Sequence, residues 1–596
     1  MSKKIVGILV VLLLLLAPLS YVHAVEVFNA STELRQWDKS KAYNGYTVFT
    51  PFKFGPNAPW TTWMIDMEGN VVHSFQSQYG PGLHAYLLED GTWLRGAQMP
   101  EANTVDTYNV LSGPRVGGLE VLDWKGNVLW HFDHYSVDEI SHHDFHKIWN
   151  KKLNQYTYIQ LVFQRKNVAD AELLGTDPIY VNDYTGNPPT VDGWSLDGII
   201  EVNQNKEIIW SWSFADHLVT TDPGGTASAV EFTDATGRPN SPPLVVADMA
   251  GIAATPQKLD VNWETVYGGP NSDWTHCNSL DYNEELDYIV VNAKHMSEFY
   301  VIDHDATFVS TTDWDANKAA ARSDLGDFVY RFGNPNAYNQ GAPAGYHTEG
   351  DYQMYASHDI QWINDYHWEP DYSGQGLWPD PTAEVALPGA GNFIIFDNGA
   401  WRTVDTCSSV PEINPYIMDD LGTLDTAYFN PPDAGYQPGA TSHNSNQVVW
   451  RYKSKVNTSF YSFYISGAQR LPNGNTMICS GATGHFFEVT PAGEVVWEYI
   501  NPETFTGFNE TIDDNDATML FSVFRAHRYG PNFPGLKGKK LTPIGTITGR
   551  VPLSGTGAFA QYPEEPVYTG WGFTGTGIGG GGGVGGGGGG GGAGGY

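Results

Sequence analysis

The chain has 596 residues, of which 67 are acidic and 32 are basic, so its formal net charge is −35. A field this negative excludes nucleic acids and anionic membrane surfaces as general partners. Hydrophobic residues make up 41% of the chain, which is enough for a core that needs no disulfides or metals. An anionic substrate would need a local basic pocket that acts against the overall charge.

The first 24 residues have the order of a secretory signal peptide. Two lysines precede an apolar run over residues 5–16, and a small-residue cleavage site ends at Ala24. The run is short for a membrane span. We therefore expect an exported chain, in the periplasm, at the cell surface or outside the cell, with no stable membrane insertion after cleavage.

After a lead-in over residues 25–42, a pattern of short strands recurs along the chain. An apolar strand, a polar turn and a strand ending in an aromatic residue occur at 64–75, 119–132, 199–212 and 486–499. A second hairpin motif accompanies them at 83–97, 391–399 and 466–482. Two hairpins per repeat are the sequence signature of a β-propeller. A β-sandwich or barrel is the alternative, but neither needs internal repeats.

The repeat spacing predicts the size of each blade. About six copies over roughly 500 residues give ~80 residues per blade, well above the ~40–45 of a minimal blade. We predict an all-β, six-bladed propeller over residues 43–569 with long inter-strand loops, for which 165–193, 213–272 and 402–442 are candidates. Residues 570–596 are almost all glycine and predict a disordered, flexible tail.

Cysteine is rare in the chain. Cys277, Cys407 and Cys479 are few for an exported protein, and their odd number leaves at least one without a partner inside a monomer. Their spacing matches no zinc pattern. The sequence leaves any pairing among them open.

Histidines recur at one position of the inner hairpin motif. Counting five residues back from the turn reaches His143, His276 and His358 in three repeats, and Ser466 in a fourth. Because inner strands of a propeller line its centre, we expect these side chains to converge there. For any single one of them, a hydrogen-bonded core or turn histidine is the ordinary alternative.

Two further polar residues belong to this predicted site. Strand alternation places Asn278 on the face of His276, and Lys294 ends the partner strand. Histidines, an asparagine and a lysine suit an oxyanion. The run "HHDFH" over 142–146 resembles a metal cluster, but alternation puts its histidines on opposite strand faces. We therefore predict neither a metal ligand set nor a cofactor.

Several stretches together resemble the bacterial arylsulfotransferases, the PAPS-independent aryl-sulfate sulfotransferases. They are "DWTHCNSLDYNEELDYIVVNAKH" (273–295), "SHDIQWI" with "FIIFDNG", and "LPNGNTMICSG" with "FFEVTPAGEVVWEY". The resemblance covers most of the chain between residues 43 and 535. It implies an exported six-bladed propeller that passes a sulfuryl group from a phenolic sulfate donor to a phenol acceptor through a sulfohistidine.

The resemblance also implies residue roles. His358 falls where the family has its sulfated histidine, and His276 with Asn278 matches the His-x-Asn pair that contacts the transferred group. His143 matches a further channel histidine. Lys294 stands where better-known members have arginine. Lysine keeps the positive charge but loses the bidentate geometry of arginine.

The residues suit this chemistry independently of the resemblance. A neutral imidazole is a competent nucleophile near pH 7. His276 or His143 could protonate the leaving phenolate, while Lys294 and Asn278 could hold the sulfuryl oxygens. No nucleotide loop or metal is required.

Two other functions stay open. One is a metal- or quinone-dependent propeller oxidoreductase, which would need a ligand set of carboxylate and histidine side chains. The other is a non-catalytic surface or interaction propeller that assembles through its glycine-rich tail. The natural donor and acceptor stay open as well, and the sequence is compatible with a homo-oligomer.

Overall fold

A computed structural model describes most of the chain between residues 26 and 549. The described residues are 26–27, 32–52, 60–100, 102, 116–166, 194–221, 230–233, 239–247, 257–260, 273–334, 352–363, 387–402, 406–415, 447–456, 459–504, 507–508 and 521–549. The predicted signal peptide, the glycine-rich tail and most of the predicted long loops lie outside these residues.

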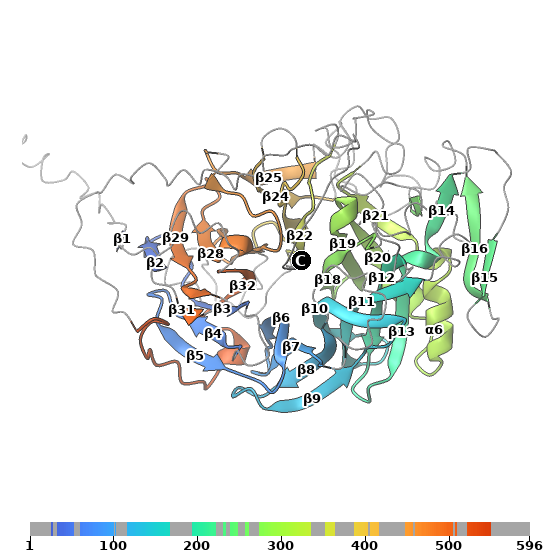
Figure 1. The fold of residues 1–596 in the computed structure, drawn as a ribbon, viewed down its shortest axis with the longest axis horizontal. Helices are drawn as coiled ribbons and strands as arrows, with labels where there is room; N and C mark the ends of the chain where they lie inside the picture. The colour runs from blue at the N-terminus through green and yellow to red at the C-terminus, as the bar shows by residue number, and fades with distance from the viewer. Residues whose placement is uncertain are drawn as a thin grey trace, which may run out of the picture.

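Six antiparallel sheets are arranged around a common centre, so the predicted six-bladed β-propeller is confirmed (Figure 1). The first blade comprises β32 (Val523–Tyr529), β3 (Tyr46–Pro51), β4 (Thr62–Ile65) and β5 (Val71–Phe75). The second comprises β6 (Gly80–Leu87), β7 (Trp93–Gln98), β8 (Gly117–Leu122) and β9 (Val128–Asp133). The third comprises β10 (Glu139–Asn150), β11 (Gln155–Lys166), β12 (Trp194–Val202) and β13 (Ile208–Ser213).

The other three blades continue the ring in chain order. The fourth comprises β18 (Cys277–Asn283), β19 (Tyr288–Ala293), β20 (Glu298–Asp303) and β21 (Phe328–Phe332). The fifth comprises β22 (His358–Trp362), β23 (Phe393–Phe396), β24 (Val410–Ile413) and β25 (Val448–Tyr452). The sixth comprises β26 (Gly467–Arg470), β27 (Thr476–Ser480), β28 (His485–Val489) and β29 (Val495–Ile500).

Segments from both ends of the chain close the ring. β32 pairs antiparallel with β3, from Tyr46 opposite Tyr529 to Pro51 opposite Val523. β2 (Glu33–Trp37) pairs with β29 and extends the sixth blade outward, and β1 (Glu26–Val27) pairs with β2. The C-terminal strand β32 thus completes the blade that the N-terminal strand β3 begins, which closes the ring.

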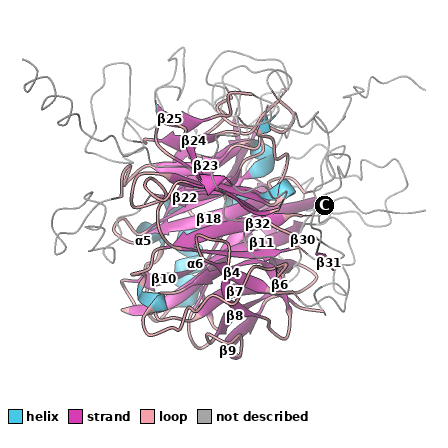
Figure 2. Ribbon diagram, turned by 90° about the vertical axis from the view of Figure 1, so that its left-hand side faces the viewer, coloured by secondary structure: helices cyan, strands magenta, loops and turns pink. Residues whose placement is uncertain are grey.

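Smaller elements lie between or beside the blades (Figure 2). β14 (Leu218–Thr221), β15 (Val230–Thr233), β16 (Pro239–Ala247) and β17 (Leu259–Asp260) form a separate sheet, and β30 (Glu503–Thr504) pairs with β31 (Gly507–Phe508). In the part of the chain that the structure describes, two helices have bounds, α5 (His304–Thr307) and α6 (Trp314–Ala321). Short 3-10 turns are η2 (Phe214–Asp216), η3 (Lys294–Met296), η4 (Asp324–Gly326), η9 (Gly481–Thr483) and η10 (Pro534–Leu536).

Aromatic residues at the strand ends pack the blades together, as the repeat pattern predicts. The indoles of Trp210, Trp212 and Trp497 are almost completely buried. Each indole N–H still has an acceptor, such as the Met67 carbonyl oxygen at 3.0 Å from Trp497 Nε1. Burying these rings removes large apolar areas from water without leaving a donor unsatisfied.

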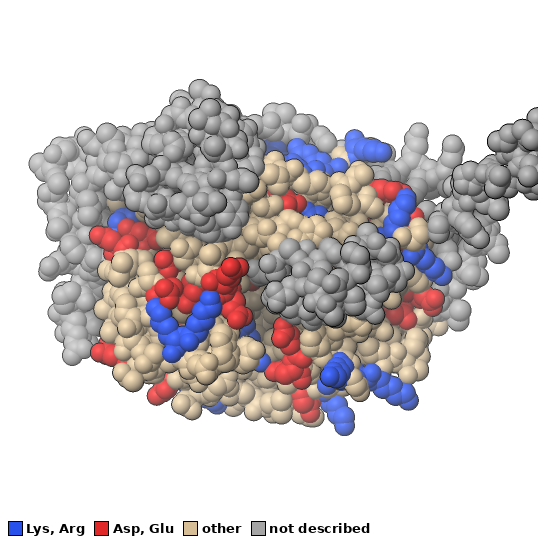
Figure 3. Space-filling view, turned by 180° about the vertical axis from the view of Figure 1, so that it is seen from behind, with Lys and Arg blue, Asp and Glu red and all other residues tan. Residues whose placement is uncertain are grey.

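The charged side chains on the surface and the unpaired cysteines agree with the amino-acid composition. Acidic and basic side chains are interspersed on the rear face of the molecule (Figure 3). Cys277 and Cys479 are buried free thiols in the cores of the fourth and sixth blades. Among the described residues, no helix is long and apolar enough to cross a membrane.

One buried histidine joins the third and fourth blades through two carboxylates. His304 Nε2 lies 3.0 Å from Glu201 Oε2, and its Nδ1 lies 2.7 Å from Asp287 Oδ1. Burial alone would lower the pKa of His304. The two carboxylates outweigh this effect and raise the pKa to about 10.

This contact predicts a pH-dependent contribution to stability. Because the folded pKa lies above the unfolded value of about 6.5, the contribution is complete below pH 6.5 and is lost as the pH rises through 10. We expect His304→Gln to lower the free energy of unfolding by about 3 kcal/mol or more at pH 6. Denaturant titrations at pH 6 and pH 10 should show a smaller difference from wild type at pH 10. An equal difference at both pH values would contradict the proposed charge on His304.

Candidate functional site

A ladder of side chain to backbone hydrogen bonds links neighbouring inner strands. In three blades, one inner-strand side chain accepts the backbone N–H of the next inner strand, at 3.0 Å each time. The pairs are Asp144 with Leu280, Ser279 with Ile360, and Asp359 with Ala468. The residues that precede these acceptors therefore occupy equivalent places in the ring: His143, Asn278 and His358.

This ladder corrects the predicted equivalence of the three histidines. His143 and His358 do occupy equivalent positions, but Asn278 holds that position in the fourth blade. His276 lies two residues earlier in the chain, and the strand pairing is irregular near all three positions. His276 still reaches the centre, since its ring centroid lies 5.1 Å from that of His143.

Left-handed backbone conformations accompany these residues. His143 has a φ of 46° and His276 a φ of 45°, and on the opposite side of the ring Ile465 has 48° and Ser466 has 97°. Such values are costly for side chains other than glycine and concentrate at functional sites. They also break the alternation of side chains along β10. The prediction that His142 and His143 point to opposite faces is therefore wrong, and their Nδ1 atoms lie 2.7 Å apart.

The hydrogen bonds around His358 determine its tautomer. The Nδ2 group of Asn398 donates to the carbonyl oxygens of Ser462 and Ile465, at 2.7 and 2.8 Å, so its Oδ1 faces His358. His358 Nδ1 lies 2.7 Å from that oxygen and must carry the proton. Nε2 therefore holds the lone pair, to which the Ile465 N–H donates at 3.2 Å.

The other two histidines have acidic groups behind them instead of an amide. His276 Nδ1 lies 2.5 Å from Asp273 Oδ2. His143 Nδ1 contacts His142, whose Nε2 lies 2.9 Å from Asp197 Oδ1. A carboxylate stabilises an imidazolium, whereas a neutral amide does so much less. The site thus holds one histidine whose Nδ1 contacts an amide, and two histidines that can accept a proton because a carboxylate stabilises the charged form.

All three histidines are neutral in the resting protein. Their exposed fractions are 4% for His143, 5% for His276 and 3% for His358. Burial lowers each pKa well below its usual value, and the positive charge of Lys294 lowers all three further. Neutral histidines are nucleophiles and bases, so the predicted role of His276 or His143 as a proton donor is less suitable than a role as base.

Lys294 supplies positive charge beside the histidines. It begins η3, with its Nζ 6.0 Å from the centre of the Trp401 ring. Burial lowers its pKa to about 8, against the opposing effect of Asp273, so the ammonium form prevails at neutral pH. It is the cation that the acidic chain needs for an anionic substrate.

Asn278 has a different environment from the one predicted. Its Nδ2 group donates to the Ser357 carbonyl oxygen at 2.8 Å, and its Oδ1 accepts from Asn292 at 2.9 Å. Asn292 in turn contacts both polar groups of Ser357. These contacts fix the backbone immediately before His358.

The opposite part of the ring is apolar. Leu83, Ile465 and Phe524 pack together, with the partly buried Phe52 and Tyr464 against them. The Phe524 ring centroid lies 6.0 Å from that of His143. An apolar aromatic wall that faces basic side chains suits a flat ring bearing an anionic group.

Arg525 of β32 lies among the inner strands and was not predicted from the sequence. Its Nη1 is 2.8 Å from Asp144 Oδ2, and its Nε is 2.9 Å from Asp359 Oδ1. It also donates to the Asn278 carbonyl oxygen at 3.0 Å and to the Tyr86 hydroxyl at 2.8 Å. Asp359 thus has a structural role as a partner of this arginine. The signal in the sequence was an arginine inside an apolar inner strand.

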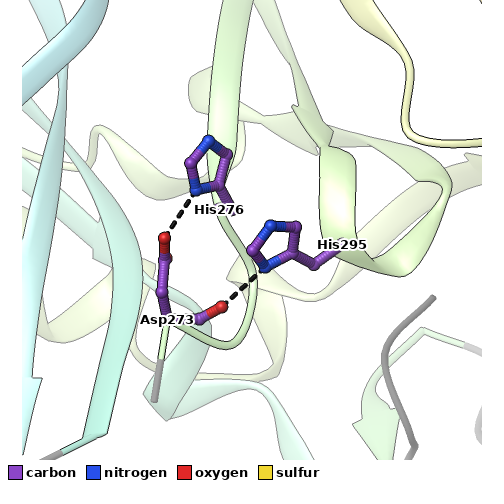
Figure 4. Close-up of side chains that lie close together, drawn as sticks. All are labelled: Asp273, His276 and His295. Carbon is purple, nitrogen blue, oxygen red and sulfur yellow. Dashed lines mark hydrogen bonds and ion pairs between the residues drawn. The ribbon is translucent and has the colours of Figure 1, made fainter. Parts of the chain in front are cut away.

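One group of side chains in the described part of the chain could hold a metal ion. Asp273, His276 and His295 each offer a ligand atom, and these atoms lie within 4.8 Å of one another (Figure 4). Sequence spacing did not predict this set, because Asp273 precedes β18 and His295 follows β19. Their proximity depends on the β18–β19 hairpin.

The fold and these residues define a six-bladed β-propeller with a histidine-rich centre. The family model "Arylsulfotransferase (ASST)" matches residues 179–367, a stretch that contains His276, Asn278, Lys294 and His358. This match supports the resemblance to the arylsulfotransferases that the motifs indicated, and with it aryl sulfotransferase activity in general. No curated protein matches the chain.

Solved structures give only distant likenesses. A protein of unknown function from Bacteroides caccae is 9% identical, with 82% of this chain and 99% of that chain covered and a TM-score of 0.33. A protein from Lactobacillus plantarum is 8% identical, with coverage of 82% and 99% and a TM-score of 0.30. The periplasmic gluconolactonase of Pseudomonas aeruginosa is 8% identical, with coverage of 77% and 96% and a TM-score of 0.31. Similarities at this level carry no argument about function.

Proposed function

We propose that this protein is an exported sulfotransferase that moves a sulfuryl group from a phenolic sulfate to a phenol through a sulfohistidine at His358. The observation that carries the proposal is the difference in the groups behind the three histidines. Asn398 gives His358 an Nε2 lone pair and stabilises a positive charge on its ring much less than a carboxylate would. Carboxylates stand behind His276 and, through His142, behind His143.

In the first step, the Nε2 lone pair of His358 forms a bond to sulfur. The bond between sulfur and the aryl oxygen breaks, and its electron pair leaves on the phenolate. Lys294 stabilises the charge on the sulfuryl and phenolate oxygens. The donor must displace the Ile465 N–H from the lone pair, a bond that is long at 3.2 Å.

In the second step, the oxygen of an acceptor phenol attacks the same sulfur. His276 or His143 takes the phenolic proton, and the electron pair of the breaking N–S bond returns to His358 Nε2. The carboxylates of Asp273 and Asp197 stabilise the imidazolium that forms. Asn278 contributes by fixing the backbone at Ser357, which makes it a positioning residue for His358 in this scheme.

Turnover of a chromogenic donor tests the proposed function. The purified protein should release nitrophenolate from 4-nitrophenyl sulfate faster when phenol is present, with ping-pong kinetics and with phenyl sulfate as the second product. No phenyl sulfate from a correctly folded protein would refute the proposal and favour a non-catalytic interaction propeller. Turnover that persists in EDTA would exclude the metal-dependent alternative.

Lys294 offers a test of charge stabilisation. We expect Lys294→Met to lower kcat by about 10²–10³, the usual loss for one oxyanion-stabilising group. Lys294→Arg should keep most of the activity, because the positive charge remains. Lys125→Met, in the turn between β8 and β9, is the matched control and should behave like wild type. Equal rates for Lys294→Met and wild type would show that this lysine takes no part in the reaction.

A further inference from the structure

A cluster of three side chains lies beside the proposed sulfuryl site. Asp273 and His276 lie just before β18, and His295 lies in η3 after β19 (Figure 4). Two backbone hydrogen bonds join these segments, from Lys294 N to His276 O at 3.2 Å and from His295 N to Thr275 O at 3.3 Å. The rings of His276 and His295 stack, with centroids 4.5 Å apart.

We propose that Asp273, His276 and His295 form a binding site for a divalent transition metal ion of the Zn²⁺ type. Two imidazoles and a carboxylate are a ligand set that Zn²⁺ accepts, with the fourth position left open. An ion at about 2.0–2.2 Å from each ligand holds ligand atoms about 3.3–3.5 Å apart. The ligand atoms here lie within 4.8 Å of one another, and the side chains must rotate to bring them to a common ion.

The surroundings of His295 match those of a metal ligand. Its Nδ1 lies 2.6 Å from the backbone oxygen of Asp273, to which it donates. Metal-ligating histidines usually donate their other ring N–H to a carbonyl or carboxylate in this way. The lone pair of His295 is therefore on Nε2, which is its ligand atom. His295 has no part in the proposed sulfuryl transfer.

Charge at the cluster sets the expected affinity. Asp273 supplies the negative charge. Lys294 opposes a second cation nearby, so we expect a Kd on the order of micromolar, weaker than that of structural zinc sites.

Occupation of the cluster has a consequence that rests on the proposed function. The ion takes the place of the proton between Asp273 Oδ2 and His276 Nδ1, now 2.5 Å apart. That proton moves to His276 Nε2, and the ring can no longer accept one from a phenol. Zn²⁺ should therefore inhibit the second step of sulfuryl transfer.

Equilibrium dialysis against ZnCl2 tests the site directly. The full chain, first treated with EDTA, should bind one Zn²⁺ that is lost in two variants. Asp273→Asn removes the carboxylate, and His295→Asn removes the ligand nitrogen while its amide can still donate to the Asp273 carbonyl. We expect each to weaken binding by at least about 30-fold. His131→Asn, on the exposed face of β9, is the matched control and should bind like wild type.

Two results would overturn the proposal. One is the absence of saturable binding by wild type up to about 0.1 mM Zn²⁺, which is far above the expected Kd. The other is wild-type affinity in a His295→Asn variant that keeps the wild-type melting temperature.

Turnover separates this inference from the proposed function. If the protein transfers sulfuryl groups, Zn²⁺ should inhibit wild type, EDTA should reverse the inhibition, and His295→Asn should resist it. Site-specific binding without inhibition would overturn the tautomer argument. If no form of the protein turns over donor, the proposed function fails, and the dialysis result still decides the metal site.

Discussion

His358→Asn should abolish sulfuryl transfer while the protein keeps its fold. The loss of a covalent nucleophile removes the two-step route, and we expect kcat to fall on the order of 10⁴-fold or more. With donor alone, the wild-type peptide that contains His358 should gain one sulfuryl group, and phenol should then remove it. Mass spectrometry of peptides digested without exposure to acid measures both the gain and the loss of the sulfuryl group. His358→Asn should show neither.

The position of the label also tests the division of roles among the histidines. His131→Asn, far from the site on β9, should give wild-type labelling and turnover. His276→Asn should still be labelled by donor but should discharge slowly to phenol, because its base is missing. A label on His143 or His276 in wild type would refute His358 as the relay. Donor consumption without any labelled residue would replace the covalent route with direct transfer.

The propeller could be predicted because its signal repeats along the chain. Hairpin turns recur with glycine at the same place, and Gly69 and Gly126 take the positive φ values of 79° and 89° that such turns require. Strand alternation and aromatic strand ends recur in the same way. The separate sheet of β14 to β17 has no counterpart in the other repeats, and it was placed in a predicted loop.

Counting residues from the turn located only part of the candidate site. His143 and His358 have equivalent places, as the offset from the turn predicts. Counting failed for His276, which lies two residues before the equivalent position, although the strand pairing is irregular near all three positions. It failed for His142 as well, because the φ of 46° at His143 turns the strand.

The partners behind the histidines come from other segments of the chain. Asn398 follows β23 and Asp273 precedes β18, and each meets a histidine only after the blades have formed. The "FIIFDNG" motif contains Asn398, but its spacing alone says nothing of the ring nitrogen that it contacts. The residue types of the site were therefore predictable from the sequence, whereas the tautomers and roles of the histidines could be assigned only from their contacts in the structure.

Arg525→Met should cause the largest loss of stability among single substitutions at the centre. Arg525 is 2% exposed and lies at ion-pair distance from Asp144 and Asp359, which belong to two other blades. Removing it leaves two buried carboxylates without their cation, which costs about 3–5 kcal/mol. The midpoint of denaturation at pH 7 measures this loss.

A charge-neutral variant shows whether the loss comes from unpaired charge or from lost packing. The triple variant Arg525→Met, Asp144→Asn, Asp359→Asn removes the cation together with both carboxylates, and we expect it to be more stable than Arg525→Met alone. Arg525→Met should also approach wild type as the pH falls, because protonation removes the unpaired charges. Burial already raises the pKa of Asp359 to about 6 with Arg525 present. If the triple variant is no more stable than the single one, Arg525 acts through its shape and hydrogen bonds to Tyr86 and Asn278 instead of through its charge.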